Sequence, residues 1–101
     1  MKNLVQNPEI EPLGIPGVSR QLAAGASSVN TALTSTCRRV SMRAVSADIR
    51  YSIGNSSQTA SATSHLIANG ERLDVAVPST PSIAVIRAGS TSGTLELTEL
   101  I

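Results

Sequence analysis

Residues 64–100 read SHLIANGERLDVAVPSTPSIAVIRAGSTSGTLELTEL, and this stretch decides the fold. Three short runs in it alternate apolar and polar residues. A period of two over runs this short is typical of strands that bury one face. The apolar residues that we expect on the buried faces are Leu73, Val75 and Val77, then Ile83 and Val85, then Leu95 and Leu97.

The joints between these runs carry turn residues. Asn69-Gly70 is a strong signal for a two-residue hairpin turn. Residues 78–81, PSTP, predict a stiff corner, because proline fixes its own φ. A looser loop over residues 89–93 would close a terminal hairpin between IAVIRAGS and GTLELTEL.

The chain before this stretch continues the same pattern. Residues 37–44 place Val40, Met42 and Ala44 on one face, and the next run alternates at Ile49, Tyr51 and Ile53. Residues 26–34 predict a weaker strand, and residues 58–63 an edge strand or a loop. Short strands at this spacing predict an all-β fold, an antiparallel β-sandwich or a jelly roll.

Residues 1–25 differ from the rest, with three of the five prolines and three of the seven glycines. We expect an extended N-terminal arm here, with room for one helical turn at residues 19–24, and a sandwich domain over residues 26–101. The arm would lie on a neighbouring subunit or, alternatively, pack back on its own sandwich. Its candidate partner-binding residues are Leu4, Val5, Ile10, Leu13, Ile15 and Val18.

The composition predicts a thin core. Tyr51 is the only aromatic residue, so aliphatic side chains must supply nearly all of the buried area. The single Cys excludes an internal disulfide, and one His with one Cys cannot form a four-ligand zinc site. We therefore expect no cofactor, and stabilisation by partners in a homo-oligomer.

Arginines 38, 39, 43 and 50 form the one concentration of charge. Arg39 and Arg43 share a strand face, and Arg50 would lie on the next strand, so we expect interface contacts or salt bridges to Asp48, Asp74 or a partner subunit. A net charge of +1 and the missing aromatics argue against nucleic acid. No apolar run approaches the ~20 residues that span a bilayer, and the N-terminus lacks a signal-peptide pattern, so we expect synthesis in the cytoplasm and no membrane partner.

Catalytic patterns are weak. Ser64, His65 and Asp74 could be imagined as a triad, but adjacent strand residues point to opposite faces, so we expect no catalytic site and no enzyme. Cys37 is expected to be a partly buried structural residue, although its arginine neighbours could lower its pKa. The pairs Glu71 and Asp74, and Glu96 and Glu99, are expected on solvated strand faces.

Three segments resemble small proteins from the structural-gene regions of tailed bacteriophages. They are LGIPGVSRQLAAGASSVNTALTSTCRRVSMRAVSADIRYSIG (13–54), QTASATSHLIANGERLDVAVPSTPSIAVIRA (58–88) and GTLELTEL (93–100). The most recognisable parts are ADIRYSIG, HLIANGERLD and the terminal pair of strands. None of these parts is a catalytic motif.

The resemblance implies a virion component, assembled in the host cytoplasm. We expect a trimer or ring that decorates the head surface or forms a fibre base, and that contacts other virion proteins such as the major capsid protein or the connector. A head–tail connector, collar or tail component is the alternative within this class. The alternative from another class is a carbohydrate-binding module for the host surface, and such modules stack sugars on aromatic rings.

Overall fold

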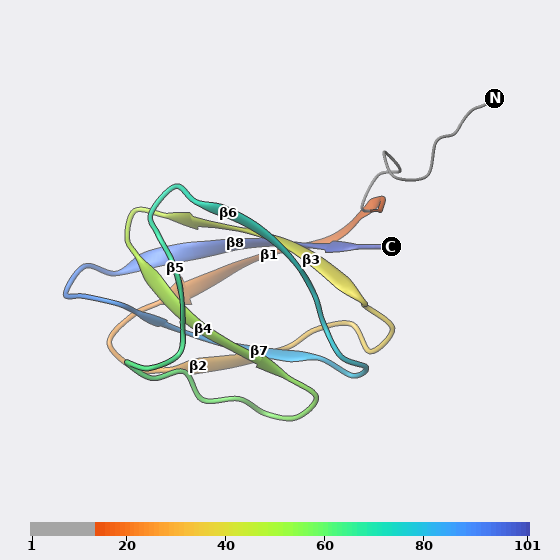
Figure 1. The fold of residues 1–101 in the computed structure, drawn as a ribbon, viewed down its shortest axis with the longest axis horizontal. Coiled ribbons are helices and arrows are strands. Elements are labelled where there is room, and N and C mark those ends of the chain that lie inside the picture. The colour runs from red at the N-terminus through yellow and green to blue at the C-terminus, as the bar shows by residue number, and fades with distance from the viewer. Residues whose placement is uncertain (1–13) are drawn as a thin grey trace.

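The computed structural model describes residues 14–101, and these residues form two four-stranded antiparallel sheets packed face to face (Figure 1). One sheet has the strand order β1-β8-β3-β6 and the other has the order β2-β7-β4-β5. The strands are β1 (Pro16–Ala24), β2 (Val29–Ala32), β3 (Arg39–Val45), β4 (Ile49–Gly54), β5 (His65–Ile67), β6 (Arg72–Ala76), β7 (Ser82–Arg87) and β8 (Gly93–Leu100). Residues 14–101 include no helix long and apolar enough to cross a membrane.

The pairing of the strands defines a jelly roll. β1 pairs with β8, β2 with β7, β3 with β6, and β4 with β5, all antiparallel. The first half of the chain is thus laid against the second half, and this ribbon is rolled up so that β3 also meets β8 and β4 also meets β7. Eight strands in two such sheets are the jelly-roll architecture. The predicted fold class is confirmed.

The core lies between the sheets and follows the predicted alternation. Val40, Met42 and Ala44 on β3 are fully buried, while Arg39 before them and Arg43 between Met42 and Ala44 are exposed. The other buried apolar residues of the cluster are Leu22, Ala24, Leu33, Cys37, Ile49, Tyr51, Ile67, Val77, Ile83, Val85, Leu95 and Leu97. Tyr51 is its only aromatic member, so the core is as aliphatic as the composition requires.

Both predicted hairpins are wrong. A turn does form at Asn69-Gly70, where the Glu71 N–H donates to the Ala68 carbonyl over 2.8 Å and Gly70 has a φ of 84°. A type I′ hairpin turn needs positive φ at both central residues, and Asn69 does not have it. β5 and β6 therefore diverge into different sheets, as do β7 and β8 around residues 89–92. The PSTP corner likewise carries the chain from one sheet to the other.

The N-terminal prediction is corrected in part. The helical turn expected at residues 19–24 is wrong, because these residues belong to β1 and pair with β8. Leu22 and Ala24 point into the core with period two. The sandwich thus begins at Pro16 rather than at residue 26, so the last part of the arm expected over residues 1–25 is a strand of the sandwich. Residues 1–13 of that expected arm lie outside the described part of the chain.

Residues 55–64 form a loop that covers the outer face of β7. The Gln58 N–H donates to Asn30 Oδ1 and the Ala60 N–H donates to Ser28 Oγ, each over 2.8 Å. Asn30 is the register partner of Ala84, so the loop lies over the face to which Ala84 points. Ala84 is fully buried as a result, although it faces away from the core.

The two ends of the sandwich differ. At the terminal pole, the described chain begins and ends side by side, with Ile15 N–H donating to the Ile101 carbonyl (2.9 Å) and the reverse bond at 2.8 Å. The loops 33–38 and 77–81 lie at this pole and are joined by the Thr80 N–H to Ser35 carbonyl bond. The turn pole, at the other end, holds the connections 25–28, 46–48, 68–71 and 88–92.

Candidate partner-binding surfaces

Three large apolar side chains gather in the solvent at the terminal pole. Ile15, Val18 and Ile101 are 69%, 47% and 78% exposed, and we call them the terminal patch. Two of the six predicted partner-binding residues, Ile15 and Val18, lie in this patch. Ile101 was missed, because only the backbone pairing of the two ends brings it beside Ile15. The other four, Leu4, Val5, Ile10 and Leu13, lie outside the described residues.

The terminal patch continues into a shallow cavity of about 130 Å³. Its lining joins the two ends of the described chain to the β2–β3 connection. The lining residues are Gly17, Val18, Thr34, Thr36, Cys37, Glu99, Leu100 and Ile101. The patch is therefore a hollowed surface rather than three isolated side chains.

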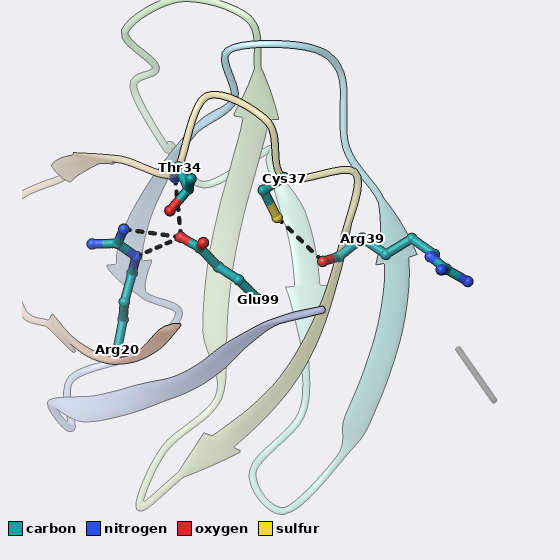
Figure 2. A network of polar contacts seen from close by, with 5 residues as sticks. All are labelled: Arg20, Thr34, Cys37, Arg39 and Glu99. Carbon is teal, nitrogen blue, oxygen red and sulfur yellow. Dashed lines mark hydrogen bonds and ion pairs between the residues drawn. The ribbon is translucent and has the colours of Figure 1, made fainter. Parts of the chain in front are cut away.

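An ion pair joins the first and last strands of the sandwich near this pole, as Figure 2 shows. Arg20 on β1 meets Glu99 on β8, with both Nε and Nη2 2.9 Å from Oε2. The Thr34 N–H donates to the same oxygen over 3.1 Å. The carboxylate of Glu99 on β8 is thus contacted both from β1 and from the β2–β3 connection. These contacts join β1 to the rest of the sandwich.

Glu99 corrects an expectation from the sequence. It was placed on a solvated strand face, but its exposure is 4%. It follows Leu95 and Leu97 at period two, so it points inward with them, and this alternation could have revealed its position. Burial favours the neutral acid and is the largest influence on its pKa. Hydrogen bonds from Thr34 and Arg20 and the guanidinium charge together outweigh burial, so the net effect is a lowered pKa.

Cys37 is a buried structural residue, as expected. Its Sγ–H donates to the Arg39 carbonyl over 3.3 Å (Figure 2), and the residue is 5% exposed. The pKa of the thiol is raised, chiefly because burial disfavours the thiolate. The neighbouring arginines do not reverse this effect, so the thiol is not an activated nucleophile.

Arg39 and Arg43 share the outer face of the sheet β1-β8-β3-β6, as predicted. Arg50 does not join them, because β4 lies in the other sheet, where its Nη1 donates to the Ser64 carbonyl over 2.9 Å. The salt bridges expected with Asp48 and Asp74 are also absent from residues 14–101. The ion pair of Arg20 with Glu99 is the only one there.

Arg72, which was not singled out, completes this face. It is the direct register partner of Arg43, and the row across the sheet reads Gln21, Glu96, Arg43, Arg72. Gln21 Nε2 donates to Glu96 Oε1 over 3.1 Å, which engages that carboxylate on the β1 side, away from Arg72. The hollow of about 200 Å³ beside the two arginines is lined by Ser41, Met42, Arg43, Val45, Arg72, Glu96 and Thr98.

The imagined triad is not assembled. His65 lies beside Tyr51, with ring centroids 5.5 Å apart, in a groove between the sheets. Asp74 lies on the exposed outer face of the other sheet, and Ser64 Oγ accepts the Ser61 N–H over 2.9 Å. No group of three or more potential metal ligands gathers anywhere in residues 14–101.

The sequence and fold were compared with known proteins in three ways. No protein-family model, curated protein or solved structure matches this chain.

Proposed function

We propose that this chain is a non-enzymatic structural protein of a tailed-phage particle. It docks on neighbouring copies and on other particle proteins through its N-terminal segment and the terminal patch. A head-surface decoration or fibre-base role is the first choice, and a head–tail connector, collar or tail component is the second. The patch is the single observation that carries the proposal, because it lies where the N-terminal segment enters the sandwich.

The exposure of the patch gives the physical reason for docking. Fully burying one aliphatic side chain contributes about 1.5–3 kcal/mol relative to leaving it in water. Three such side chains lie together at the terminal pole, two of them beside the adjoining cavity, and clustered exposed apolar side chains are more typical of interaction sites than single ones are. A partner that covers Ile15, Val18 and Ile101 would add the apolar burial that a core with one aromatic residue lacks.

The way in which β1 is anchored supports the same role. A partner that holds residues before Pro16 exerts its pull on β1, which pairs with β8 at Pro16 and, after a register shift, from Ser19 to Ala24. The Arg20–Glu99 ion pair and the Thr34 hydrogen bond reinforce this junction at the pole where the pull is applied. A partner bound to the N-terminal segment would therefore be linked to the whole sandwich through β1.

The jelly-roll topology and the sequence resemblance support the virion assignment. Jelly rolls are common in viral capsid proteins, but they also occur in lectins and cupins, so the fold alone does not decide. The carbohydrate-binding alternative depended on an aromatic platform. Tyr51 is 8% exposed and belongs to the core, so it does not offer an open ring face for a sugar.

A patch variant tests the proposal. Ile15→Ser, Val18→Ser and Ile101→Ser, made together, should lower the amount of the protein in purified particles at least tenfold. The matched control is Val29→Ser with Leu66→Ser, since these side chains are 52% and 46% exposed but lie away from the terminal pole. Circular dichroism of both purified variants checks that the β-fold is kept. Normal incorporation of a folded patch variant would overturn the proposal.

A further inference from the structure

β6 is an edge strand that pairs with β3 on one side (Figure 1). Just after it, the Val77 N–H donates to the Arg38 carbonyl over 2.8 Å. In an antiparallel pair such bonds recur at every second residue, so the odd-numbered residues of β6 bond to β3. The backbone N–H and C=O groups of Arg72, Asp74 and Ala76 therefore point to the free side of the strand. No hydrogen bond within residues 14–101 uses them.

The other three edge strands carry features that hinder pairing with another chain. β1 has a register shift between Pro16 and Ser19 and points the charged Arg20 inward, toward Glu99. β2 and β5 have four and three residues. Proline, bulges, inward charges and short length are features by which proteins protect sheet edges. β6 is longer than β2 and β5, keeps one register with β3 over its five residues, and contains no proline, bulge or inward charge.

The outward side chains of β6 form a self-complementary pattern. Arg72 and Asp74 are both exposed and, being two residues apart, point to the same side of the strand. When two copies of β6 pair antiparallel with Leu73 opposite Leu73, each Arg72 lies directly opposite Asp74 of the other copy. Opposite charges at this position attract. Neither residue forms an ion pair within residues 14–101, so both charges are open to this contact.

The same register satisfies the backbone. Arg72 and Asp74 are residues whose N–H and C=O groups point to the free side, so each opposite pair exchanges two hydrogen bonds and the two-fold pairing forms four. Registers displaced by two residues place Arg72 opposite Arg72, or Asp74 opposite Asp74. Like charges directly opposite each other repel. The charge pattern of β6 therefore selects one register for pairing with itself.

The inner side of β6 gains apolar contact in this pairing. Leu73 and Val75 pack against the core but are half-buried, because no strand lies beyond them in their own sheet. A groove of about 300 Å³ separates Val75 and Ala76 from His65 on β5, so the other sheet does not close over this end of β6. In the pairing described, the two Leu73 side chains meet at the seam between the copies.

We propose that β6 pairs with β6 of a second copy about a two-fold axis at Leu73, so that two four-stranded sheets become one sheet of eight strands. In such strand addition, main-chain hydrogen bonds give the affinity, and here the opposed charges set the register. The interface is isologous, because both copies use the same surface. It lies along the side of the sandwich, apart from the terminal patch. The inference therefore goes beyond the proposed function and does not rest on it.

Charge exchange in the full-length chain tests the proposed pairing. Light scattering over a dilution series gives the dissociation constant of the dimer. Arg72→Asp and Asp74→Arg, made singly, should each raise that constant at least tenfold, because like charges then face each other across the seam. The double variant Arg72→Asp, Asp74→Arg should restore the dimer, since the exchanged pattern is again self-complementary. An equimolar mixture of the two single variants should also form dimers.

Two controls accompany these variants. Arg87→Asp makes the same charge change on the other sheet and removes an exposed hydrogen bond to Ser92, so it should leave the dimer unchanged. The patch variant should also keep the dimer, because its three substitutions lie at the terminal pole. Circular dichroism of each purified variant checks that the β-fold is kept.

A disulfide gives a second readout of the register, in a chain that also carries Cys37→Ala. Leu73→Cys should link two copies under oxidising conditions, because opposite residues that exchange no hydrogen bonds have Cα atoms about 4.5 Å apart, within the span of a disulfide. Val75→Cys is the matched control. Its two copies lie about 13 Å apart along the strand direction and should stay unlinked.

Several outcomes would overturn the inference. They are a wild-type chain that stays monomeric, a dimer that the single charge variants leave unchanged, a mixture of those variants that forms no dimer, and a link through Val75→Cys in place of Leu73→Cys. Loss of the dimer in the patch variant would also overturn it, because the copies would then meet at the terminal pole. Incorporation of the patch variant into particles judges the proposed function separately.

Discussion

Glu99 Oε2 lies 2.9 Å from Arg20 Nη2, and this contact joins the last strand of the sandwich to the first. The Glu99 side chain is 6% exposed and that of Arg20 is 25% exposed, so the pair lies at the border between core and solvent. Removing the charge of one residue leaves the charge of the other without a partner and only partly solvated. This relationship governs the first two predictions.

Glu99→Gln should destabilise the fold. Breaking a fully buried pair costs about 3–5 kcal/mol, and partial exposure of Arg20 lowers our expectation to about 2–3 kcal/mol. Urea unfolding followed by circular dichroism measures the loss. Glu96→Gln is the matched control on the same strand, because its hydrogen bond to Gln21 is exposed and its loss should cost under about 1 kcal/mol. Equal losses in the two variants would contradict this account.

The stability should fall in acid partly through Glu99. Its pKa is lower in the folded chain than in the unfolded chain, where a Glu titrates near about 4.3. The ionised form therefore stabilises the fold above that pH, and the contribution is lost as the pH falls through the folded-state pKa. Unfolding free energies measured between pH 7 and pH 3 should show the wild type and Glu99→Gln converging toward low pH. A constant difference would argue against this linkage.

Cys37 should be protected in the native state. Its thiol is buried and its pKa is raised, so both access and thiolate content are low. At pH 8, a disulfide reagent should modify it at least about tenfold faster in urea than in buffer. A raised folded-state pKa also means that stability is present below the unfolded pKa of about 8.5 and is lost as the pH rises through the folded value. Cys37→Ala should lack this alkaline loss.

Gly93 should tolerate no side chain. A Cβ there would lie 2.7 Å from the Val45 carbonyl oxygen and 2.9 Å from the Ala47 Cβ. Both neighbours are held in place, one in β3 and one in the following tight turn, so Gly93→Ala should cost about 1–3 kcal/mol. Gly89→Ala, four residues earlier, meets nothing within 4 Å and should be near neutral in the same unfolding assay. Near-neutral behaviour of Gly93→Ala would refute the predicted clash.

The sequence predicted the strand faces well, because a period of two reports burial directly. Val40, Met42 and Ala44 are the clearest case, and Leu95 and Leu97 follow the same rule. Extending that rule by one step to Glu99 would have placed the carboxylate inside. A charged residue is rarely buried unless it is paired, so the carboxyl group of Glu99 indicates an exposed position unless its partner Arg20 is known.

The pairing of strands could not be predicted in the same way. Alternation shows which face of a strand is buried but not which strand lies beside it. Asn69-Gly70 is a hairpin signal only if both residues adopt positive φ, and here Gly70 alone does so, so the turn joins two sheets. The row that brings Arg72 beside Arg43 depends on this pairing, and so does the contact between Ile15 and Ile101. For each candidate surface, the sequence therefore predicted only some of the residues. It indicated Ile15 and Val18 but not Ile101, and Arg39 and Arg43 but not Arg72.

The position of both described chain ends at one pole has a consequence for engineering. A fusion at the C-terminus follows Ile101 and would crowd the surface proposed for docking, and an N-terminal fusion would extend the segment proposed to hold a neighbour. The connection at residues 88–92 lies at the opposite end, and Gly89 there has open space around it. A reporter peptide inserted after Gly89 would project outward from a docked copy, so this connection is the natural place to display cargo.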